Sequence, residues 1–228
     1  MKALIVNGDD FGASRGINRG ILEAHLHGIL TSTSLLVNAP GSEEAGELRQ
    51  RAPGMSIGLH ADLEDRAGRA IDSALGLRRE LDDQLRRFQE LTGRLPTHLD
   101  AHHNVHREPG LLPGFLDFAR EHGLPLREHS PVRYVSQFYG QWGGRTHLEQ
   151  ISVENMTRML GTKIGDGISE LSCHPGYVDA AYTTAYSAER EAEVRTLCDP
   201  SLRAVLAANS IRLASYHDLA RLLEEGYA

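Results

Sequence analysis

The stretch from Ala3 to Ser14 reads ALIVNGDDFGAS, and it decides the fold because an apolar run ends there in two adjacent acids, a Phe and a Gly. A continuous apolar run rich in β-branched Ile and Val predicts a strand that is buried on both faces. Asp9 and Asp10 follow at the point where this strand should reach the surface. Neighbouring carboxylates repel each other, so either a turn exposes both to water or a cation makes the pair favourable.

Short apolar runs like this one alternate with amphipathic segments along the whole chain. We expect strands at Ala3–Val6, Ser32–Val37, Met55–Leu59, Thr97–Leu99, Leu124–Leu126, Ile168–Cys173 and Ile211–Ala214. We expect helices near Ser14–His27, Ser42–Arg51, Leu77–Leu91, Gly110–His122, Leu148–Leu160, Ser187–Leu197 and His217–Glu225. About seven strand–helix repeats favour an α/β fold, a single-domain irregular (β/α) barrel similar to a TIM barrel and spanning residues 1–228. A doubly wound open sheet is the alternative.

Two stretches show neither pattern. Ala61–Ala74 follows His60, and Arg133–Thr146 contains the only tryptophan, Trp142, among several glycines. Long loops on an α/β scaffold are either walls and lids of a site or plain surface excursions, and the sequence leaves both interpretations open.

Composition limits the class of function. The chain has 24 basic and 31 acidic residues, a net charge of −7, and it lacks the basic stripe that a nucleic-acid partner requires. Cys173 and Cys198 have no metal-like spacing, so we expect free thiols in a reducing compartment, the cytoplasm. Neither a signal peptide nor a membrane span is expected, because the apolar runs are too short.

Carboxylates and histidines follow several of the expected strands. They are Asp9 and Asp10 after the first strand, His60 after the third, Asp100, His102, His103 and His106 after the fourth, and His174 after the sixth. In a parallel barrel the carboxyl ends of the strands form the active site, so we expect these side chains to converge. The other histidines, at 25, 27, 98, 122, 129, 147 and 217, are interpreted as structural.

One carboxylate and two imidazoles form a facial triad that suits a divalent metal with open positions for water and substrate. The chemistry that such a site supports is hydrolysis, in which a second carboxylate accepts the proton of water. Asp9 and Asp10 can divide these roles, one as base and one as ligand. The sequence therefore predicts metal-assisted hydrolysis, and it does not by itself name the substrate.

Five motifs in order make the chain resemble the YdjC/ChbG-type (YdjC-like) carbohydrate deacetylases. They are LIVNGDDFG at 4–12, GILTSTSLLVN at 28–38, IGLH at 57–60, PTHLDAHHNVH at 96–106 and CHPGYVD at 173–179. The resemblance implies a hydrolase of amide C–N bonds that removes N-acetyl groups from amino sugars or small chito-oligosaccharides. It also implies a bound divalent ion, for which Mg²⁺ is expected before Zn²⁺, Mn²⁺ or Co²⁺, and it implies a homodimer. Between His60 and Asp100 this chain is shorter than larger family members, which leaves the size of the accepted sugar open.

The resemblance also assigns roles to residues. It implies that Asp10, His60 and His102 bind the metal, that Asp9 is the general base, and that His174 protonates the leaving amine. His106 or a metal-bound water is the alternative acid. Arg127 either orients Asp9 or lies on the surface.

Two other functions share parts of this pattern. A phosphoesterase would use the same cluster but would place more basic residues beside the strand ends than Arg107 and Arg127. A non-catalytic sugar-binding protein would not need the spare carboxylate of Asp9.

Overall fold

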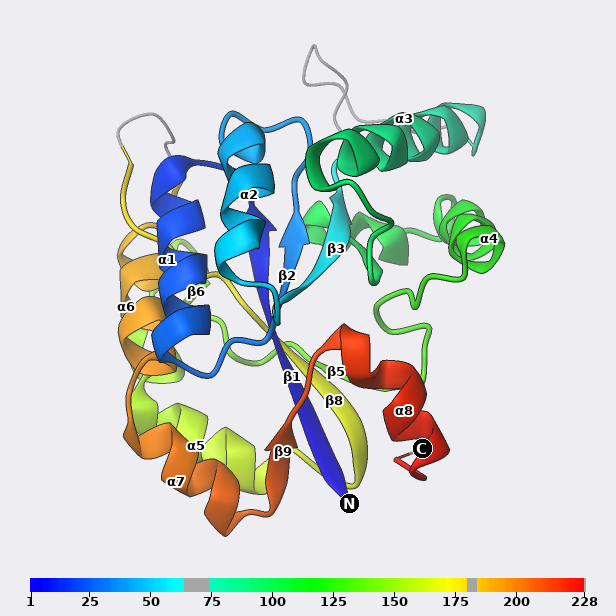
Figure 1. The fold of residues 1–228 in the computed structure, drawn as a ribbon. Helices are drawn as coiled ribbons and strands as arrows, with labels where there is room; N and C mark the ends of the chain where they lie inside the picture. The colour runs from blue at the N-terminus through cyan, green and yellow to red at the C-terminus, as the bar shows by residue number, and fades with distance from the viewer. Residues whose placement is uncertain (64–73, 180–183, 228) are drawn as a thin grey trace.

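Parallel strands form a curled sheet at the centre of the computed structural model, and helices pack around its outer side (Figure 1). The structure describes residues 1–63, 74–179 and 184–227. The strands of the sheet are β1 (Lys2–Phe11), β2 (Ser32–Leu35), β3 (Ser56–Ala61), β4 (Leu99–Ala101), β5 (Val132–Val135), β8 (Gly167–Cys173) and β9 (Ile211–Leu213). Their order is β4-β3-β2-β1-β8-β5, with β9 also paired to β1, and all these pairings are parallel. The predicted α/β fold is confirmed.

Each parallel crossover uses helices on the outer face. The helices are α1 (Arg15–His27), α2 (Ser42–Leu48), α3 (Ala74–Thr92), α4 (Leu112–His122), α5 (Val153–Thr162), α6 (Ala188–Leu197), α7 (Ser201–Ala208) and α8 (Leu219–Glu224). Short 3₁₀ turns are η1 (Arg49–Arg51), η2 (His102–Arg107), η3 (Leu148–Ile151) and η4 (Tyr216–Asp218), and β6 (Gln141–Trp142) pairs with β7 (Arg145–Thr146) in a separate hairpin.

The two edges of the sheet come close together, which makes it an irregular barrel. Beyond β4, Leu126 forms a single parallel bridge with Leu99, while β5 lies at the opposite edge against β8. Only five residues lie between Leu126 and Val132, so the path of six residue steps spans at most about 22 Å. The sheet must therefore curl until its edges nearly meet.

Side chains of β1 alternate between the outside and the inside of this barrel. Leu4 and Val6 belong to the main core under the helices, whereas Ala3 and Ile5 pack with Tyr216 of η4 and with α8. A strand that is buried on both faces needs this continuous apolar run, as the sequence predicts. Apolar residues thus fill the barrel interior at the amino-terminal half of β1, and the polar site lies at the carboxyl-terminal end of the strand.

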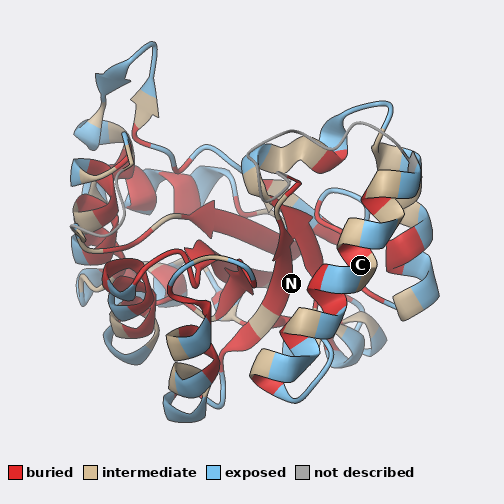
Figure 2. Cartoon of the chain, turned by 90° about the horizontal axis from the view of Figure 1, so that it is seen from above, coloured by how far each residue is buried: buried red, intermediate tan, exposed pale blue. Residues whose placement is uncertain are grey.

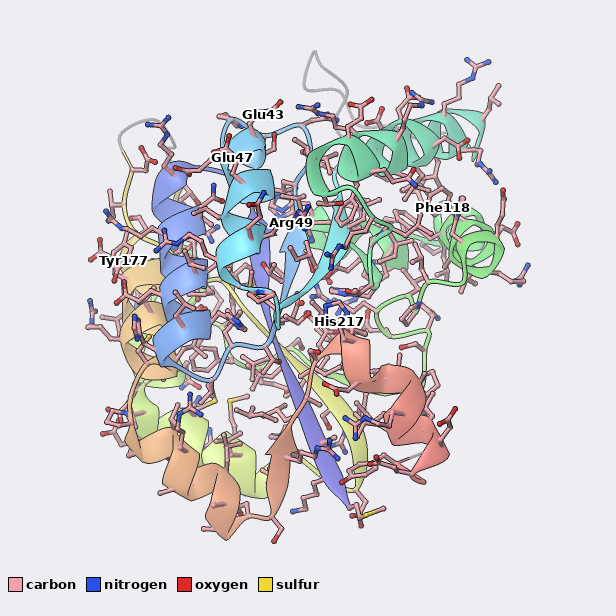
Figure 3. The ribbon with its side chains drawn as sticks, viewed as in Figure 1. Glu43, Glu47, Arg49, Phe118, Tyr177 and His217 are labelled. Atoms are coloured by element: carbon pink, nitrogen blue, oxygen red, sulfur yellow. The ribbon has the colours of Figure 1, made fainter. Side chains whose placement is uncertain are left out.

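The outer helices are amphipathic where they meet solvent. In α2, Glu43 and Glu47 are exposed while Ala45 and Gly46 are buried, and on α4 Phe118 packs into the core (Figure 3). Seen from above, buried strands are ringed by helices with exposed outer sides (Figure 2). Within the described ranges no helix has both the length and the apolarity needed to cross a bilayer.

Three expectations about elements were wrong. The expected strand Leu124–Leu126 makes only the bridge at Leu126, because Pro125 lacks the N–H that a longer ladder needs. The strand at this place in the chain is β5, whose last three residues fall in the stretch expected to be irregular. Helix α7 was not expected at all. Of the irregular stretch Ala61–Ala74, residues 64–73 lie outside the described part of the chain.

Candidate active site

A bulge in β1 turns two neighbouring carboxylates into the same site. Between Gly8 and Phe11, β1 contains one residue more than the facing part of β2, and Asp10 has a left-handed backbone with φ +70°. Side chains of neighbouring strand residues normally point to opposite faces, but a bulge re-aims one of them, and Asp tolerates the left-handed conformation. Gly12 completes the turn at φ +91°, where a Cβ would come within 2.7 Å of a backbone oxygen. This geometry explains the sequence DDFG.

Asp10 meets two histidines from two other strand ends. Its Oδ1 lies 3.4 Å from Nε2 of His60 and 3.2 Å from Nδ1 of His102, and this oxygen is buried without a hydrogen bond. The three ligand atoms lie within 4.8 Å of one another. Three converging donors with an unsatisfied oxygen between them are the arrangement that a divalent cation requires, so these residues fit a metal ion.

The turn that presents His102 is strained. His103 and Asn104 follow it with φ +54° and +53°, a conformation that is uncommon for residues other than glycine. Each such residue costs of order 1–3 kcal/mol and is kept where the surroundings enforce it, often at active sites.

Asp100 contacts the ring nitrogen of His60 that does not face Asp10. His60 Nδ1 lies 2.6 Å from Oδ1 of Asp100, while Oδ2 accepts a hydrogen bond of 2.6 Å from Ser34. Burial alone would lower the pKa of His60, but Asp100 and the other nearby carboxylates outweigh burial and raise that pKa to about 10. A carboxylate that accepts from the far nitrogen fixes the ring of a ligating histidine and strengthens its basicity.

Asp9 is bound by a buried arginine rather than by the histidines. Arg127 NH1 and NH2 each donate to one Asp9 oxygen at 2.8 Å, and Arg127 is only 1% exposed, so the surface alternative for Arg127 is wrong. Burial alone would raise the pKa of Asp9, but the charge of Arg127 outweighs it and lowers that pKa. Arg127 also reaches Asp100 at 2.7 Å and donates to Glu170.

A second set of possible ligands, formed by Asp9, His60 and Asp100, lies beside the first. Both of its carboxylates are already paired with Arg127. A cation there would compete with a buried guanidinium, so the set around Asp10 is the better candidate.

The remaining predicted residues are divided between the site and its surroundings. His174 Nε2 lies 3.9 Å from Oδ2 of Asp9, and burial lowers the pKa of this histidine. His106 lies apart from the site, with its Nε2 3.4 Å from Oε2 of Glu128. His98, interpreted as structural, stacks on Tyr216 at 3.9 Å, and burial lowers its pKa to about 3.

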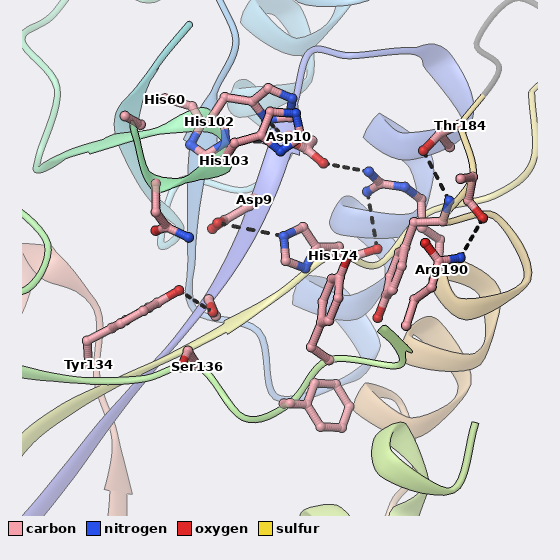
Figure 4. Close-up of a pocket in the computed structure, with 18 residues that line it drawn as sticks. Asp9, Asp10, His60, His102, His103, Tyr134, Ser136, His174, Thr184 and Arg190 are labelled. Carbon is pink, nitrogen blue, oxygen red and sulfur yellow. Dashed lines mark hydrogen bonds and ion pairs between the residues drawn. The ribbon is translucent and has the colours of Figure 1, made fainter. Parts of the chain in front are cut away.

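The five residues predicted to carry the reaction line one cavity of about 570 Å³ (Figure 4). Its lining includes Asp9, Asp10, His60, His102 and His174 together with His103, Asn104, Tyr134, Ser136, Tyr139, Tyr186 and Arg190, but not His106. All five predicted site residues are therefore brought together.

Sequence reasoning missed Arg190 and Glu170. Arg190 on α6 donates to Asp10 Oδ2 at 2.5 Å, and Glu170 on β8 accepts from Arg127 at 2.6 and 2.9 Å. For Arg190 the available signal was a helix that carries charges around its whole circumference. For Glu170 it was an acidic residue inside an apolar strand.

Known sequences resemble this chain over nearly its full length. A model of the family described as YdjC-like protein matches residues 3–208. A chitooligosaccharide deacetylase of Enterobacter sp. (strain 638) is 34% identical, and the alignment covers 96% of this chain and 99% of that protein. A carbohydrate deacetylase of Geobacillus stearothermophilus is 35% identical, with 96% and 98% covered.

Solved structures share the fold. A protein of Enterococcus faecalis V583, provisionally named for cellobiose-phosphate cleavage, superposes with a TM-score of 0.81 at 28% identity, covering 96% of this chain and 98% of the other. A family 4 carbohydrate esterase of Streptomyces lividans, determined with acetate, gives a TM-score of 0.61 at 12% identity, covering 93% and 92%. At that identity the likeness concerns the fold alone.

Proposed function

The chain belongs to the YdjC-like protein family, and we propose that it is a divalent-metal-dependent deacetylase that removes N-acetyl groups from an amino sugar or a small chito-oligosaccharide. The enzyme class, carbohydrate deacetylase, rests on the names of relatives that match nearly the whole chain. The metal, the roles of the residues and the acetylated sugar are our proposal.

One observation carries it: two adjacent carboxylates enter one cavity in different environments. Asp10 faces His60 and His102, and Asp9 faces Arg127 and His174. A site that only bound a cation would need Asp10 but not a second carboxylate held beside it. A hydrolase needs both, one as ligand and one as base.

Asp10, His60 and His102 would hold the ion. A divalent ion there would polarise the acetyl carbonyl and lower the pKa of water. Asp9 would accept the proton of the attacking water at Oδ2, which accepts from Arg127 and keeps a second lone pair, whereas Oδ1 accepts from both Arg127 and Asn7. Asp100 would keep His60 oriented, and Arg190 would keep Oδ2 of Asp10 occupied so that Oδ1 faces the histidines.

His174 would supply the proton that the leaving amine needs. An amine leaves poorly as its anion, so amide cleavage requires a general acid near the nitrogen. His174 lines the same cavity as Asp9, and its Nε2 lies 3.9 Å from Oδ2 of Asp9. His106, which does not line the cavity, has less support for this role.

The direct test is acetate release from a panel of N-acetylated monosaccharides and disaccharides, with Mg²⁺, Zn²⁺, Mn²⁺ or Co²⁺ and with a chelator. We expect at least one of these sugars to release acetate, and we expect this release to require the divalent ion and to stop with the chelator. The proposal fails if no member of the panel releases acetate with any of the ions.

The two alternative functions fit this cavity less well. A phosphoesterase needs cations for its anionic substrate, and among the described lining residues the only Lys or Arg is Arg190, which is paired with Asp10. A non-catalytic sugar-binding protein does not need Asp9, a second carboxylate in the cavity lining that Arg127 holds in place from behind the lining.

Three further points extend the proposal. We propose Mg²⁺ as the native ion and a homodimer as the assembly, both from the family resemblance. We propose the cytoplasm as the compartment, because Cys173 and Cys198 are free thiols. Metal analysis of the purified protein and its mass in solution test the first two.

A further inference from the structure

One aromatic side chain at the active-site cavity has no part in the proposed reaction. Tyr139 lines the cavity and keeps 39% of its surface exposed. Its ring stacks on Tyr186, with centroids 4.7 Å apart and planes 7° apart. Tyr186 therefore stacks on one face of the Tyr139 ring, while more than a third of the Tyr139 surface remains exposed.

The support beneath this ring is rigid. Tyr186 is buried, its hydroxyl donates to Glu193 at 2.5 Å, and the same hydroxyl accepts from the backbone N–H of Gly140 at 2.8 Å. Tyr139 is thus held from behind by a ring that is hydrogen-bonded both to α6 and to the residue that follows Tyr139. A large aromatic face kept open and immobile costs little entropy when it binds a flat ligand.

The position of Tyr139 relates it to the reacting groups. The Tyr139 ring lies edge-on to the ring of His174, at 5.7 Å between centroids, and His174 lies 3.9 Å from Asp9. A group stacked on Tyr139 would therefore lie next to His174, the residue that is proposed to protonate the leaving amine. Asn104, Ser136 and Thr184 line the same cavity and offer hydrogen bonds.

We propose that Tyr139 is a specificity-determining platform on which a pyranose ring of the substrate stacks, which deepens and rests on the proposed function. The C–H face of a pyranose is apolar and flat, and it fits an aromatic face, while its hydroxyls reach polar side chains at the rim. The platform selects sugar rings over acyclic N-acetylated compounds of similar size.

The chain provides a matched control in Trp142. It is also an exposed aromatic residue, 50% exposed and stacked on His147 at 3.6 Å. Gln141 lines the cavity, so its neighbour Trp142 points to the opposite side of β6 and is absent from the lining. Loss of this ring should leave sugar binding unchanged.

Binding is measured first, without turnover. N,N′-diacetylchitobiose is titrated by calorimetry into metal-stripped wild type and the Tyr139→Ala, Tyr139→Leu, Tyr139→Phe and Trp142→Ala variants. We expect Kd to rise roughly three- to tenfold for Ala and Leu, the range of an aromatic stacking contact. Phe keeps the ring, and Trp142→Ala keeps the platform, so both should bind as wild type does. Tyr139→Leu retains apolar volume against Tyr186 and guards against a folding defect.

Other binding results overturn the inference. They are unchanged Kd in both Tyr139→Ala and Tyr139→Leu, an equal loss in Tyr139→Phe, or no binding by the wild type. Kinetics then add a second readout: with metal restored, KM for the disaccharide should rise while kcat stays within about twofold, as expected for loss of uniform binding. A fall in kcat with unchanged KM would mean that Tyr139 only supports His174. Wild-type binding that depends on the ring but yields no acetate would reject the proposed function and leave the platform standing.

Discussion

Arg127 donates one hydrogen bond to each oxygen of Asp9, and both donor–acceptor distances are 2.8 Å. This bidentate pair fixes the plane of the carboxylate and keeps it ionised next to Asp10, which meets Arg190 and two histidines instead. Two neighbouring acids thus have separate cationic partners, which removes most of their mutual repulsion. The separation of roles between them leads to the first prediction.

Replacing Asp9 by Asn should leave metal binding intact and lower kcat by roughly 10²–10⁴-fold, the usual contribution of a general base. An amide preserves the shape but cannot take a proton from water. Metal content and acetate release should be measured on the same preparation, with Asp117→Asn as control, because Asp117 is exposed and forms a surface ion pair with Arg120. Loss of the metal in Asp9→Asn with normal binding in Asp10→Asn would reverse the two roles.

Replacing Arg127 by Met should lower the free energy of unfolding by about 3–5 kcal/mol, as expected when a buried charge loses its partner. Asp9, Asp100 and Glu170 would then share the interior without the guanidinium that contacts all three. Urea unfolding measures this loss. Arg86→Met, which removes only the exposed pair with Asp83, should stay within about 0.5 kcal/mol of wild type. If Arg127→Met changes the free energy of unfolding as little as the Arg86→Met control does, the buried interior does not depend on this cation.

Replacing His174 by Ala should affect amides far more than activated esters. A phenolate leaves without protonation, whereas an amine does not, so we expect a loss of roughly 10²–10⁴-fold on an N-acetyl sugar and a much smaller one on a phenyl acetate. The ratio of the two kcat/KM values is the measurement. If both substrates lose equally while metal content is unchanged, His174 positions the substrate or supports the fold, and the proton donor lies elsewhere.

Glu193 should make stability depend on pH. Burial raises its pKa from the ordinary value of 4.5 to about 8, although Tyr186 and the backbone of His174 donate to it. A carboxyl group with a raised folded-state pKa stabilises the fold in its neutral form. Its contribution is therefore complete below pH 4.5 and is lost as the pH rises towards 8.

Glu193→Gln, which is neutral at every pH, should remove this decline. Between pH 5 and 8 the wild-type free energy of unfolding should fall relative to that of the variant, by up to about 1.4 kcal/mol per pH unit. Urea unfolding across this range measures the difference, with exposed Glu47→Gln as control. Parallel pH curves for wild type and Glu193→Gln would show that Glu193 is ionised in the folded protein.

The strand ends could be predicted from the sequence because their geometry is general. Asp10, His60 and His102 lie at the carboxyl ends of three different strands, and parallel strands bring these ends to one edge of the sheet. The bulge that turns Asp10 beside Asp9 could not be foreseen from alternation, which places neighbours on opposite faces. Only the unusual pair of acids before Phe11 and Gly12 indicated it.

The supporting charges depend on contacts between distant segments. Arg190 lies on a helix and reaches Asp10 across 180 residues of chain, so no rule about strand ends finds it. Glu170 was counted within the apolar run Ile168–Cys173, yet an acid buried there requires a cation. The sequence named Arg127 only as a residue that could orient Asp9, and its pairing with Glu170 follows only once the edges of the sheet are known to meet.

The central claim is that one divalent ion held by Asp10, His60 and His102 makes the chain a deacetylase. The most direct measurement follows bound metal and acetate release together while a divalent ion is added back to chelator-stripped protein. It compares wild type with His60→Ala, His102→Ala and the exposed His129→Ala as control. We predict that activity rises in proportion to bound ion and saturates at one ion per chain in wild type and control, and that both ligand variants lose metal and activity. Full activity of the stripped wild type, or undiminished metal binding by both ligand variants, would contradict the account.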